Sequence, residues 1–358
     1  MKVRFVNFGK QYLQHKKEID KAITRCLTDG DLILRKDLEE FEKKFAKYIG
    51  VKYAVGLNSG TDALYLALKA SGIGKGDEVL VSSHTFVASV QVIVQCGAKP
   101  ILYEQREDGG ILITDKITKN TKAIITCHIA GKFEGNMNSL MPIVKKYNLV
   151  LIEDSCQSLG ATQNGKKAGS FGIGCFSFYP AKILGAFGDG GMITTNDKKI
   201  ADEARELRNH YKKDYSKWGI NSRLDNIQAA VLNVKLKYLS KILERRKEIA
   251  KMYLKEFSNW VIADYKDAIG LPEDRPGRVW QDFVINIGSR RDTLYTYLKK
   301  KGIETMKNEY PMPIKKLPET LEYEASTLRI PCNETLTEKE VDYVIKSIKK
   351  FYERKGSL

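Results

Sequence analysis

The sequence predicts an α/β fold, in which a mostly parallel sheet is covered by helices on both faces. Two observations predict it. Short apolar runs of strand length alternate with segments whose apolar residues recur at helical spacing. The runs are also apolar throughout, as expected for strands buried on both sides, and parallel neighbours need helical crossovers.

The first half of the chain shows this alternation element by element. Within 36–48, Leu38, Phe41 and Phe45 recur every three or four residues, which predicts an amphipathic helix. A strand, a turn and a second helix follow, and the pattern then repeats. We expect helices over 36–48, 63–70, 87–96 and 140–147, and strands over 53–57, 78–82, 100–103, 123–128 and 149–152.

The pattern of expected helices and strands changes after Asn221. Two long helices are expected over 224–238 and 242–257, and strand and helix then alternate again, as in 279–287 and 338–352. A chain of 358 residues exceeds the usual size of one domain. We therefore predict a large domain over 1–240 and a smaller C-terminal α/β domain over 241–358. No period of 20 to 50 residues recurs, which excludes a repeat array.

Composition indicates a globular protein, since 42% of the residues are hydrophobic and they are spread along the whole length. The longest apolar stretches, such as 123–127 and 149–152, are far shorter than the roughly 20 residues that cross a bilayer. The start of the chain carries no apolar region with a cleavage site. We therefore expect a cytoplasmic protein.

The formal net charge of +16 favours anionic partners, which include nucleic acid, a membrane surface or a phosphorylated small molecule. Lysines are spread through segments such as 297–301 and are not interleaved with aromatic residues. This favours a solvated, lysine-rich surface, and we predict neither a nucleic-acid nor a membrane partner. A basic nucleic-acid-binding protein remains the alternative from another functional class.

Cysteine and histidine content bears on metal sites. The six cysteines form no CxxC pair, and there are four histidines. This argues against both a zinc site and a disulfide framework. We expect reduced, mostly buried thiols and no metal.

The first motif that could carry chemistry is Asn58-Ser59-Gly60-Thr61, at a strand-to-helix turn. Exposed N–H groups at a helix N-terminus carry partial positive charge, and glycine allows close approach of the backbone. With the Thr61 hydroxyl, they form a phosphate cup. An ordinary helix N-cap by Ser or Thr explains the segment equally well when it is taken alone.

The second motif is the acidic pair Glu153-Asp154, which ends an apolar strand and is followed by Gln157. A carboxylate in this position can hold a proton on a heterocyclic nitrogen, bind a metal or cap the next helix. The third motif runs from Cys175 through Pro180 to Lys182, with a glycine-dense turn after it. Most lysines face solvent, but one at the end of a buried segment loses hydration, which favours a neutral, nucleophilic amine.

Five motifs together resemble the DegT/DnrJ/EryC1/StrS family of sugar aminotransferases, which depend on pyridoxal 5′-phosphate (PLP). They are NSGTDAL (58–64), HTFVAS (84–89), IEDSCQSLGA (152–161), SFYPAKILGAFGDGG (177–191) and NSRLDNIQAA (221–230), in family order. The resemblance extends from about Gly30 to the segment 335–341. It implies the PLP-dependent aminotransferase fold, fold type I.

The resemblance also implies roles for particular residues. Lys182 would form the Schiff base with PLP and act as general acid and base, and Asp154 would pair with the pyridine nitrogen. Gln157 would hydrogen-bond the ring hydroxyl, and Phe86 would stack on the ring face. The residues expected around the phosphate are Gly60, Thr61, Ser177 and, from a neighbouring subunit, Asn221. A homodimer with shared active sites is therefore implied.

The resemblance further implies the reaction. L-Glutamate would leave its amino group on PLP and depart as 2-oxoglutarate, and a nucleotide-linked keto sugar would then take the amino group, a ping-pong mechanism. A lysine at position 182 argues against members that carry histidine there and dehydrate their substrate. The turn 184–191 looks closer to enzymes that act at sugar C3, so we predict amination of a 3-keto sugar on dTDP or UDP. Amination at C4 is the alternative.

Two departures from the family pattern bear on the substrate. Where family members commonly have a segment like HLYGQ, this chain has His128-Ile129-Ala130-Gly131-Lys132, which adds a positive charge. The chain is also short between Tyr310 and Ala325, where the family often has a longer loop that meets the sugar nucleotide. Substrate identity is therefore the inference that the resemblance supports least directly.

Overall fold

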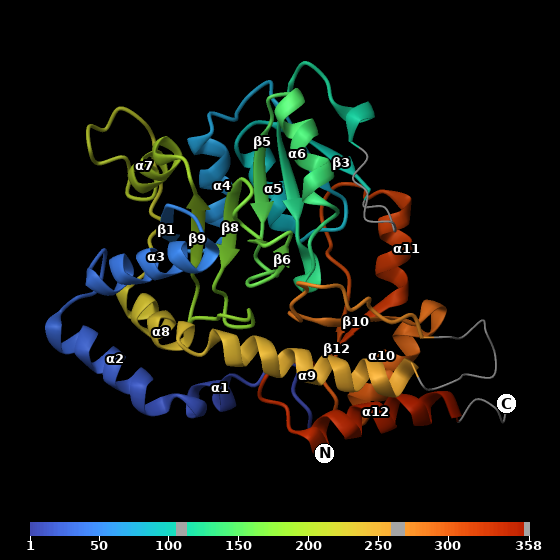
Figure 1. The fold of residues 1–358 in the computed structure, drawn as a ribbon. Coiled ribbons are helices and arrows are strands. Elements are labelled where there is room, and N and C mark those ends of the chain that lie inside the picture. Colours follow the sequence, from blue (N-terminus) through green and yellow to red (C-terminus); the bar gives the residue numbers. More distant parts are fainter. Residues whose placement is uncertain (105–112, 259–268, 354–358) are drawn as a thin grey trace.

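The computed structural model describes residues 1–104, 113–258 and 269–353. Its centre is a seven-stranded sheet in the order β1-β9-β8-β5-β4-β2-β3 (Figure 1). The strands are β1 (Tyr53–Leu57), β2 (Glu78–Ser82), β3 (Lys99–Tyr103), β4 (Thr121–Cys127), β5 (Val150–Asp154), β8 (Ile173–Ser177) and β9 (Gly191–Thr195). The strands β2, β3, β4, β5 and β8 pair in parallel, whereas β9 is antiparallel to both of its neighbours, β1 and β8. The prediction of a mostly parallel sheet is confirmed.

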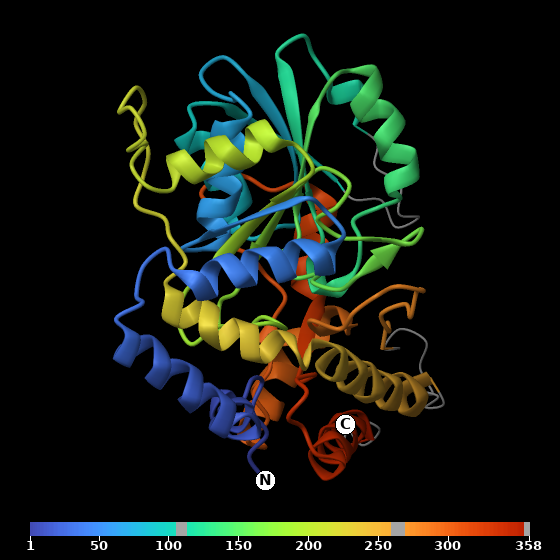
Figure 2. The ribbon, with the colours of Figure 1, turned by 60° about the vertical axis from the view of Figure 1, so that its left-hand side comes forward.

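Helices cover both faces of this sheet. Consecutive strand residues point to opposite sides, so strands that are apolar throughout present apolar side chains to both layers of helices. On β4, Ala123 and Ile125 pack with α4 (Gly60–Ala70), α5 (Val87–Gln95) and α7 (Lys198–Leu207). Between them, Ile124 packs with α6 (Met137–Lys146) on the other face. In Figure 2 the strands lie between α6, in green, and α4 and α5, in blue.

The expected helix over 36–48 is α3 (Lys36–Ile49), which buries Leu38, Phe41 and Phe45 against β8 and α8 (Asn226–Leu236). It ends where Gly50 adopts a left-handed conformation that few other residues tolerate. The N-terminal helices α1 (Phe8–Gln14) and α2 (Lys16–Asp29) were not among the expected elements. Only Ile19 and Cys26 of α2 are buried apolar residues, so its periodic signal is weak.

A second, three-stranded sheet lies in the C-terminal part, in the order β10-β12-β11. Its strands are β10 (Phe283–Asn286), β11 (Met306–Lys307) and β12 (Thr327–Ile330). The helices α9 (Leu239–Ser258), α10 (Arg291–Lys300), α11 (Pro318–Ser326) and α12 (Glu338–Glu353) accompany it. Figure 1 shows α12 beside α9, and their apolar faces share one core with β10 and β12. Val3 joins this core too, while the boundary at 240/241 stays a prediction.

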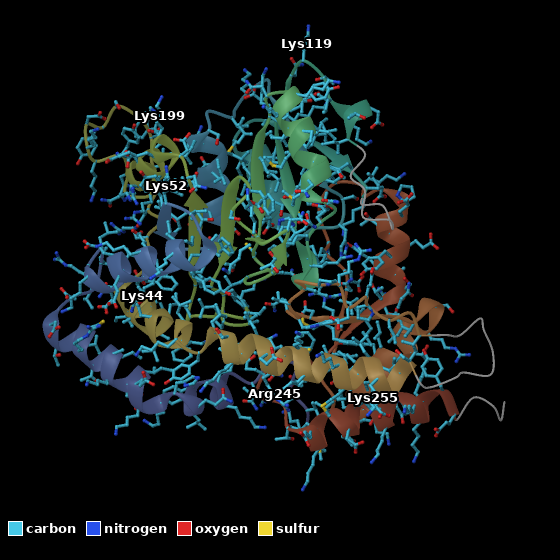
Figure 3. The ribbon with its side chains drawn as sticks, in the orientation of Figure 1. Lys44, Lys52, Lys119, Lys199, Arg245 and Lys255 are labelled. Carbon is cyan, nitrogen blue, oxygen red and sulfur yellow. The ribbon has the colours of Figure 1, made fainter. Side chains whose placement is uncertain are left out.

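Basic side chains are spread over the molecule and do not gather on one element. Figure 3 labels six of them, on α3, α7, α9 and two loops: Lys44, Lys52, Lys119, Lys199, Arg245 and Lys255. Within the described ranges, no helix combines the length and the apolar character that a membrane crossing needs.

Candidate active site

The carboxyl ends of β1, β2, β4, β5 and β8 meet at one edge of the large sheet, where the chain also enters β9. There Asp154 lies between Cys127 of β4 and Cys175 of β8, its register partners. Ser177 pairs with Gly191, which in turn pairs with Leu57, just before the Asn58 turn. The three motifs of the sequence analysis therefore come together, as expected for an α/β sheet.

The turn after β1 is built for close backbone approach. Ser59 caps α4 by accepting a hydrogen bond from the Asp62 N–H at 3.0 Å, so the N-cap interpretation holds. A side chain at Gly60 would place its Cβ 2.8 Å from both Cys156 Sγ and Ser177 Cβ. Among the described residues, none accepts a hydrogen bond from the Gly60 or Thr61 N–H. The positive end of α4 thus presents free donors, and the same turn also fits a phosphate cup.

Ser177 adds a hydroxyl at the end of β8. Its Oγ accepts a hydrogen bond from the Tyr179 N–H at 3.2 Å, which leaves the hydroxyl proton to be donated elsewhere. A Cβ on Gly191 would lie 2.1 Å from the Ser59 carbonyl oxygen. Glycine at 191 therefore lets the start of β9 pass directly beneath the cup.

Asp154 is buried and held from two sides. Its Oδ2 accepts a hydrogen bond from Ser89 Oγ at 2.7 Å, and its Oδ1 accepts one from the Cys156 N–H at 3.2 Å. Burial, and then the Asp154 carboxylate, raise the pKa of the neighbouring thiols of Cys127 and Cys175. The two thiols therefore stay neutral beside Asp154.

Glu153, the other member of the acidic pair, faces the opposite side of β5. It is fully buried and accepts hydrogen bonds from the N–H groups of Gly169, Phe171 and Gly172 at 2.7–2.9 Å. A contact of 3.3 Å joins it to His128 Nε2. Its oxygens are therefore satisfied by the loop before β8, and only Asp154 faces the cup.

Lys182 lies in the loop that follows β8, half-buried, with its N–H bonded to the Tyr179 carbonyl at 2.8 Å. The pKa of the Cys156 thiol depends on the charged groups near it. Burial and the Asp154 carboxylate raise the pKa of that thiol, while the positive charge of Lys182 acts in the opposite direction. Asp154 and Lys182 thus both lie within electrostatic reach of one side chain, with Gly60 beside it.

Gln157 and Phe86 lie at the same edge. The Gln157 amide oxygen accepts a hydrogen bond from the Ala130 N–H at 3.0 Å, and its nitrogen donates to the Tyr310 hydroxyl at 3.1 Å. One amide hydrogen remains for a ligand. The Phe86 ring is 53% exposed and meets the Tyr310 ring edge-on at 6.4 Å between centroids, so one face of the ring is open to a ligand.

Asn221 is the one predicted residue that the protomer leaves apart. It is exposed, and its backbone pairs with Asn209 in an isolated antiparallel bridge. No hydrogen bond joins its side chain to another residue in the described ranges. The next residue, Ser222, donates to Asp62 at 2.6 Å and accepts from the Asn58 N–H, so the segment is anchored beside the cup of its own chain.

Two residues of this edge were not among the candidates. Ser89 belongs to the HTFVAS motif, and a hydroxyl one helical turn after Thr85 was a signal that it faces the same way. Tyr310 is separated from Gln157 by 153 positions in the sequence, and no local pattern marks it.

Comparison with known proteins agrees with the motifs described above. A model of the DegT/DnrJ/EryC1/StrS aminotransferase family matches residues 13–349. The chain is 38% identical to a dTDP-3-amino-3,6-dideoxy-alpha-D-galactopyranose transaminase of Aneurinibacillus thermoaerophilus, over 98% of this chain and 99% of that protein.

Solved structures agree with this match. DesV of S. venezuelae, in complex with a ketimine intermediate, superposes with a TM-score of 0.91 at 35% identity, covering 98% of this chain and 99% of that one. The NtdA structure from Bacillus subtilis with bound cofactor PMP gives a TM-score of 0.88 at 28% identity, covering 98% and 85%.

Proposed function

Because the chain belongs to the DegT/DnrJ/EryC1/StrS aminotransferase family, we propose that it transfers the amino group of L-glutamate to C3 of a keto sugar linked to dTDP or UDP. The chain is a PLP-dependent sugar aminotransferase of fold type I. L-Glutamate delivers the amino group and leaves as 2-oxoglutarate before the keto sugar accepts it, in a ping-pong order. The C3 position rests on the resemblance of the turn 184–191 and on the 3-amino sugar in the relative's name.

The geometry at the carboxyl edge of the sheet supports the assignment of the site: Asp154 accepts from the Cys156 N–H, the Cys156 thiol lies against the Gly60 turn, and Lys182 follows β8, whose Cys175 pairs with Asp154. When bound, PLP supplies an electron sink whose ring nitrogen must stay protonated. The buried Asp154 carboxylate would stabilise that proton. The N–H groups of Gly60 and Thr61, with the Ser177 hydroxyl, would hold the phosphate. The chemistry of this donor set, a carboxylate with N–H and hydroxyl donors, supports a site for PLP.

Lys182 has two proposed tasks. Its amine would hold the cofactor covalently and, when free of it, would move the proton at the α-carbon of the amino donor. Gln157 would use its remaining amide hydrogen on the ring hydroxyl, and Phe86 would cover one ring face. The Tyr310 hydroxyl holds the Gln157 amide in the orientation that this needs.

Positive charge near this edge supports an anionic sugar nucleotide. The Gly131 carbonyl accepts a hydrogen bond from the Val279 N–H at 2.9 Å, which places Lys132 and Arg278 on two segments that lie backbone to backbone. Desolvation, followed by the nearby charge of Arg278, lowers the pKa of Lys132. The Lys132 side chain forms no ion pair within the described ranges, so its amine is available to the diphosphate.

A homodimer with shared sites is also proposed, because Asn221 is exposed and its side-chain amide has no hydrogen-bond partner among the residues that the structure describes. The preceding segment exposes Tyr215 by 74% and Trp218 by 97%, and a second copy would cover such rings. Asn221 of one protomer would then reach the phosphate in the other.

A screen of 3-keto and 4-keto sugar nucleotides with L-glutamate tests the reaction, with the product analysed by mass and NMR. We expect conversion of a 3-keto substrate, release of 2-oxoglutarate and an amino group on C3. Lys182→Ala should abolish turnover, whereas Lys199→Ala, which removes an exposed lysine of α7, should not change it. An amino group on C4 would contradict the C3 assignment, and full activity of Lys182→Ala would contradict the site.

A mixed dimer tests the sharing of sites. Lys182→Ala and Asn221→Ala chains carrying different tags are co-expressed, and the heterodimer is isolated through both tags. If each site uses Lys182 of one chain and Asn221 of the other, one of the two sites is intact, and about half of the wild-type activity returns. A heterodimer no more active than the Asn221→Ala homodimer would refute the shared arrangement.

A further inference from the structure

The loop that carries Lys182 is closely fixed by its own residues. The Lys182 N–H donates to the Tyr179 carbonyl at 2.8 Å, and the Ala186 N–H donates to the Phe178 carbonyl at 2.7 Å. A side chain on Gly185 would lie 2.3 Å from the Pro180 carbonyl oxygen. The loop is therefore a tight turn whose position decides where the Lys182 side chain starts.

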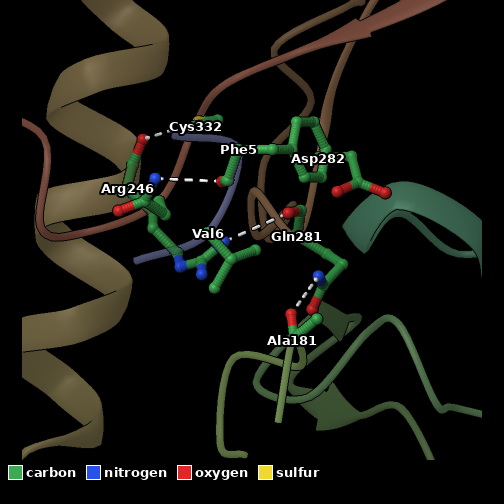
Figure 4. Close-up of a pocket in the computed structure, with 8 residues that line it drawn as sticks. Phe5, Val6, Ala181, Arg246, Gln281, Asp282 and Cys332 are labelled. Atoms are coloured by element: carbon green, nitrogen blue, oxygen red, sulfur yellow. Dashed lines mark hydrogen bonds between the residues drawn. The ribbon is translucent and has the colours of Figure 1, made fainter. Parts of the chain in front are cut away.

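A single side chain from the C-terminal part holds this turn on both sides of Lys182. Gln281 Nε2 donates to the Ala181 carbonyl at 3.1 Å, and Gln281 Oε1 accepts from the Ile183 N–H at 3.1 Å. Figure 4 shows the bond to Ala181, at the edge of a small cavity lined by both residues. A planar amide that donates to the residue before and accepts from the residue after fixes the intervening peptides in position and rotation.

Gln281 is itself held rigidly. The guanidinium of Arg246, on α9, donates to the carbonyl oxygens of Trp280 and Gln281 at 3.2 and 3.1 Å. Arg246 is buried and pairs with Glu334 at 2.8 Å. Burial alone would raise the pKa of the Glu334 carboxyl, but the charge of Arg246 and further hydrogen bonds outweigh it and lower that pKa, so the pair stays ionised. The two hydrogen bonds that Gln281 forms with Ala181 and Ile183, here called the clamp, are thus supported by a buried ion pair of the C-terminal core.

We propose that Gln281 is a positioning residue for the reaction: it holds the backbone on both sides of Lys182 and so sets where the lysine amine can reach. The inference rests on the proposed role of Lys182. It also links the segment before β10 to the reacting amine, so the Arg246–Glu334 pair supports the Lys182 loop through Gln281.

The test replaces Gln281 by leucine, which keeps the side-chain volume close and removes both hydrogen bonds. Misplacement of a reacting group by about 1 Å can cost about 100-fold. We expect kcat to fall about 10- to 100-fold and KM for both substrates to stay within about twofold. The pH midpoint of the visible absorbance of the PLP-bound enzyme should also move, because it reports the surroundings of the Lys182 amine.

Gln11→Leu is the matched control. Gln11 is a buried glutamine that donates to Glu334 in the same network at 2.7 Å, but it has no hydrogen bond with the Lys182 loop. It should lower the melting temperature without changing kcat or the pH midpoint. The proposal is overturned if Gln281→Leu binds PLP and keeps both wild-type kcat and the wild-type midpoint, whatever its melting temperature.

Gln281→Glu covers the case in which the leucine variant does not fold. It keeps the acceptor for the Ile183 N–H and loses the donor to Ala181, so a smaller loss of kcat with a shifted midpoint supports the clamp, and wild-type values overturn it. Borohydride reduction and peptide mapping of the wild-type enzyme separate the two levels of inference. PLP on another lysine overturns the proposed role of Lys182 together with the clamp, whereas PLP on Lys182 with an unaffected Gln281→Leu overturns the clamp alone.

Discussion

Gly60→Ala is the sharpest perturbation of the phosphate cup. The new methyl carbon would lie 2.8 Å from Cys156 Sγ, 2.8 Å from Ser177 Cβ and 3.3 Å from Ser177 Cα. Carbon atoms in contact prefer about 3.5–4.0 Å, so α4 and the end of β8 must separate by about 1 Å. Overpacking of this kind costs about 1–3 kcal/mol. If that cost falls on the PLP-bound state, in which the cup must close on the phosphate, PLP binds about 5- to 150-fold more weakly.

The assay is a titration of the PLP-free enzyme with PLP, followed by visible absorbance, together with a thermal melt. Gly9→Ala is the control, because Gly9 lies in α1 and its new Cβ would meet only Asn7 Oδ1 at 3.8 Å, an ordinary contact. It removes one helical glycine without crowding and should leave PLP binding unchanged. Adding Cys156→Ala to Gly60→Ala removes one of the two close contacts and should restore part of the affinity.

An unchanged PLP affinity in Gly60→Ala would refute the cup. So would equal weakening by Gly9→Ala, since that would trace the loss to helix propensity and not to the contact with Ser177. If the double variant binds PLP no more tightly than Gly60→Ala, the crowding lies entirely at Ser177, at the end of β8.

Three further predictions follow from single contacts. Ser89→Ala removes the hydrogen bond to Asp154 and should lower the free energy of unfolding by about 1.5–3 kcal/mol in urea denaturation. Lys132→Gln should raise KM for the sugar nucleotide about two- to fivefold without changing kcat. Since burial and Arg278 lower the pKa of Lys132, its charge is lost as pH rises, so the wild-type KM should increase on the alkaline side, and a parallel increase in the variant would contradict this. Glu153→Gln should destabilise the fold by about 1–3 kcal/mol while PLP absorbance stays normal, and loss of the absorbance in a folded variant would assign Glu153 to the cofactor.

Much of the large domain could be predicted because its strands are continuous apolar runs. The expected strands 53–57 and 78–82 match β1 and β2 residue for residue. The antiparallel β9 was not foreseen, and Gly191–Thr195 contains only two large apolar residues, Met192 and Ile193. Direction depends on the connection: parallel neighbours need a crossover, and no helix lies between β8 and β9. The helix expected over 140–147 starts earlier in the structure, because Asn136 caps α6 and Met137 is buried one turn before Leu140.

Whether a residue of the candidate site could be predicted depends on how far along the chain its partners lie. Gly60 and Asp154 were found because each stands in a recognisable local motif at a strand end. Gln281 and Tyr310 were missed because they act across 98 to 153 positions, and only the folded chain brings them to Ile183 and Gln157. Their amide and hydroxyl groups look like those of any other polar residue in the sequence. Such contacts cannot be inferred from spacing.

The acidic pair shows how far prediction from the sequence reaches for two adjacent residues. Neighbouring residues on a strand face opposite sides, so Glu153 and Asp154 cannot both reach the cofactor edge. Strand alternation alone leaves open which one does, and the choice of Asp154 came from the family resemblance. In the structure three backbone N–H groups of the 169–172 loop occupy Glu153, whereas Asp154 keeps one hydroxyl and one N–H donor and meets thiols. A carboxylate already saturated by the backbone is a structural support, and one left with spare acceptor capacity in a neutral pocket is available to a proton that a ligand brings.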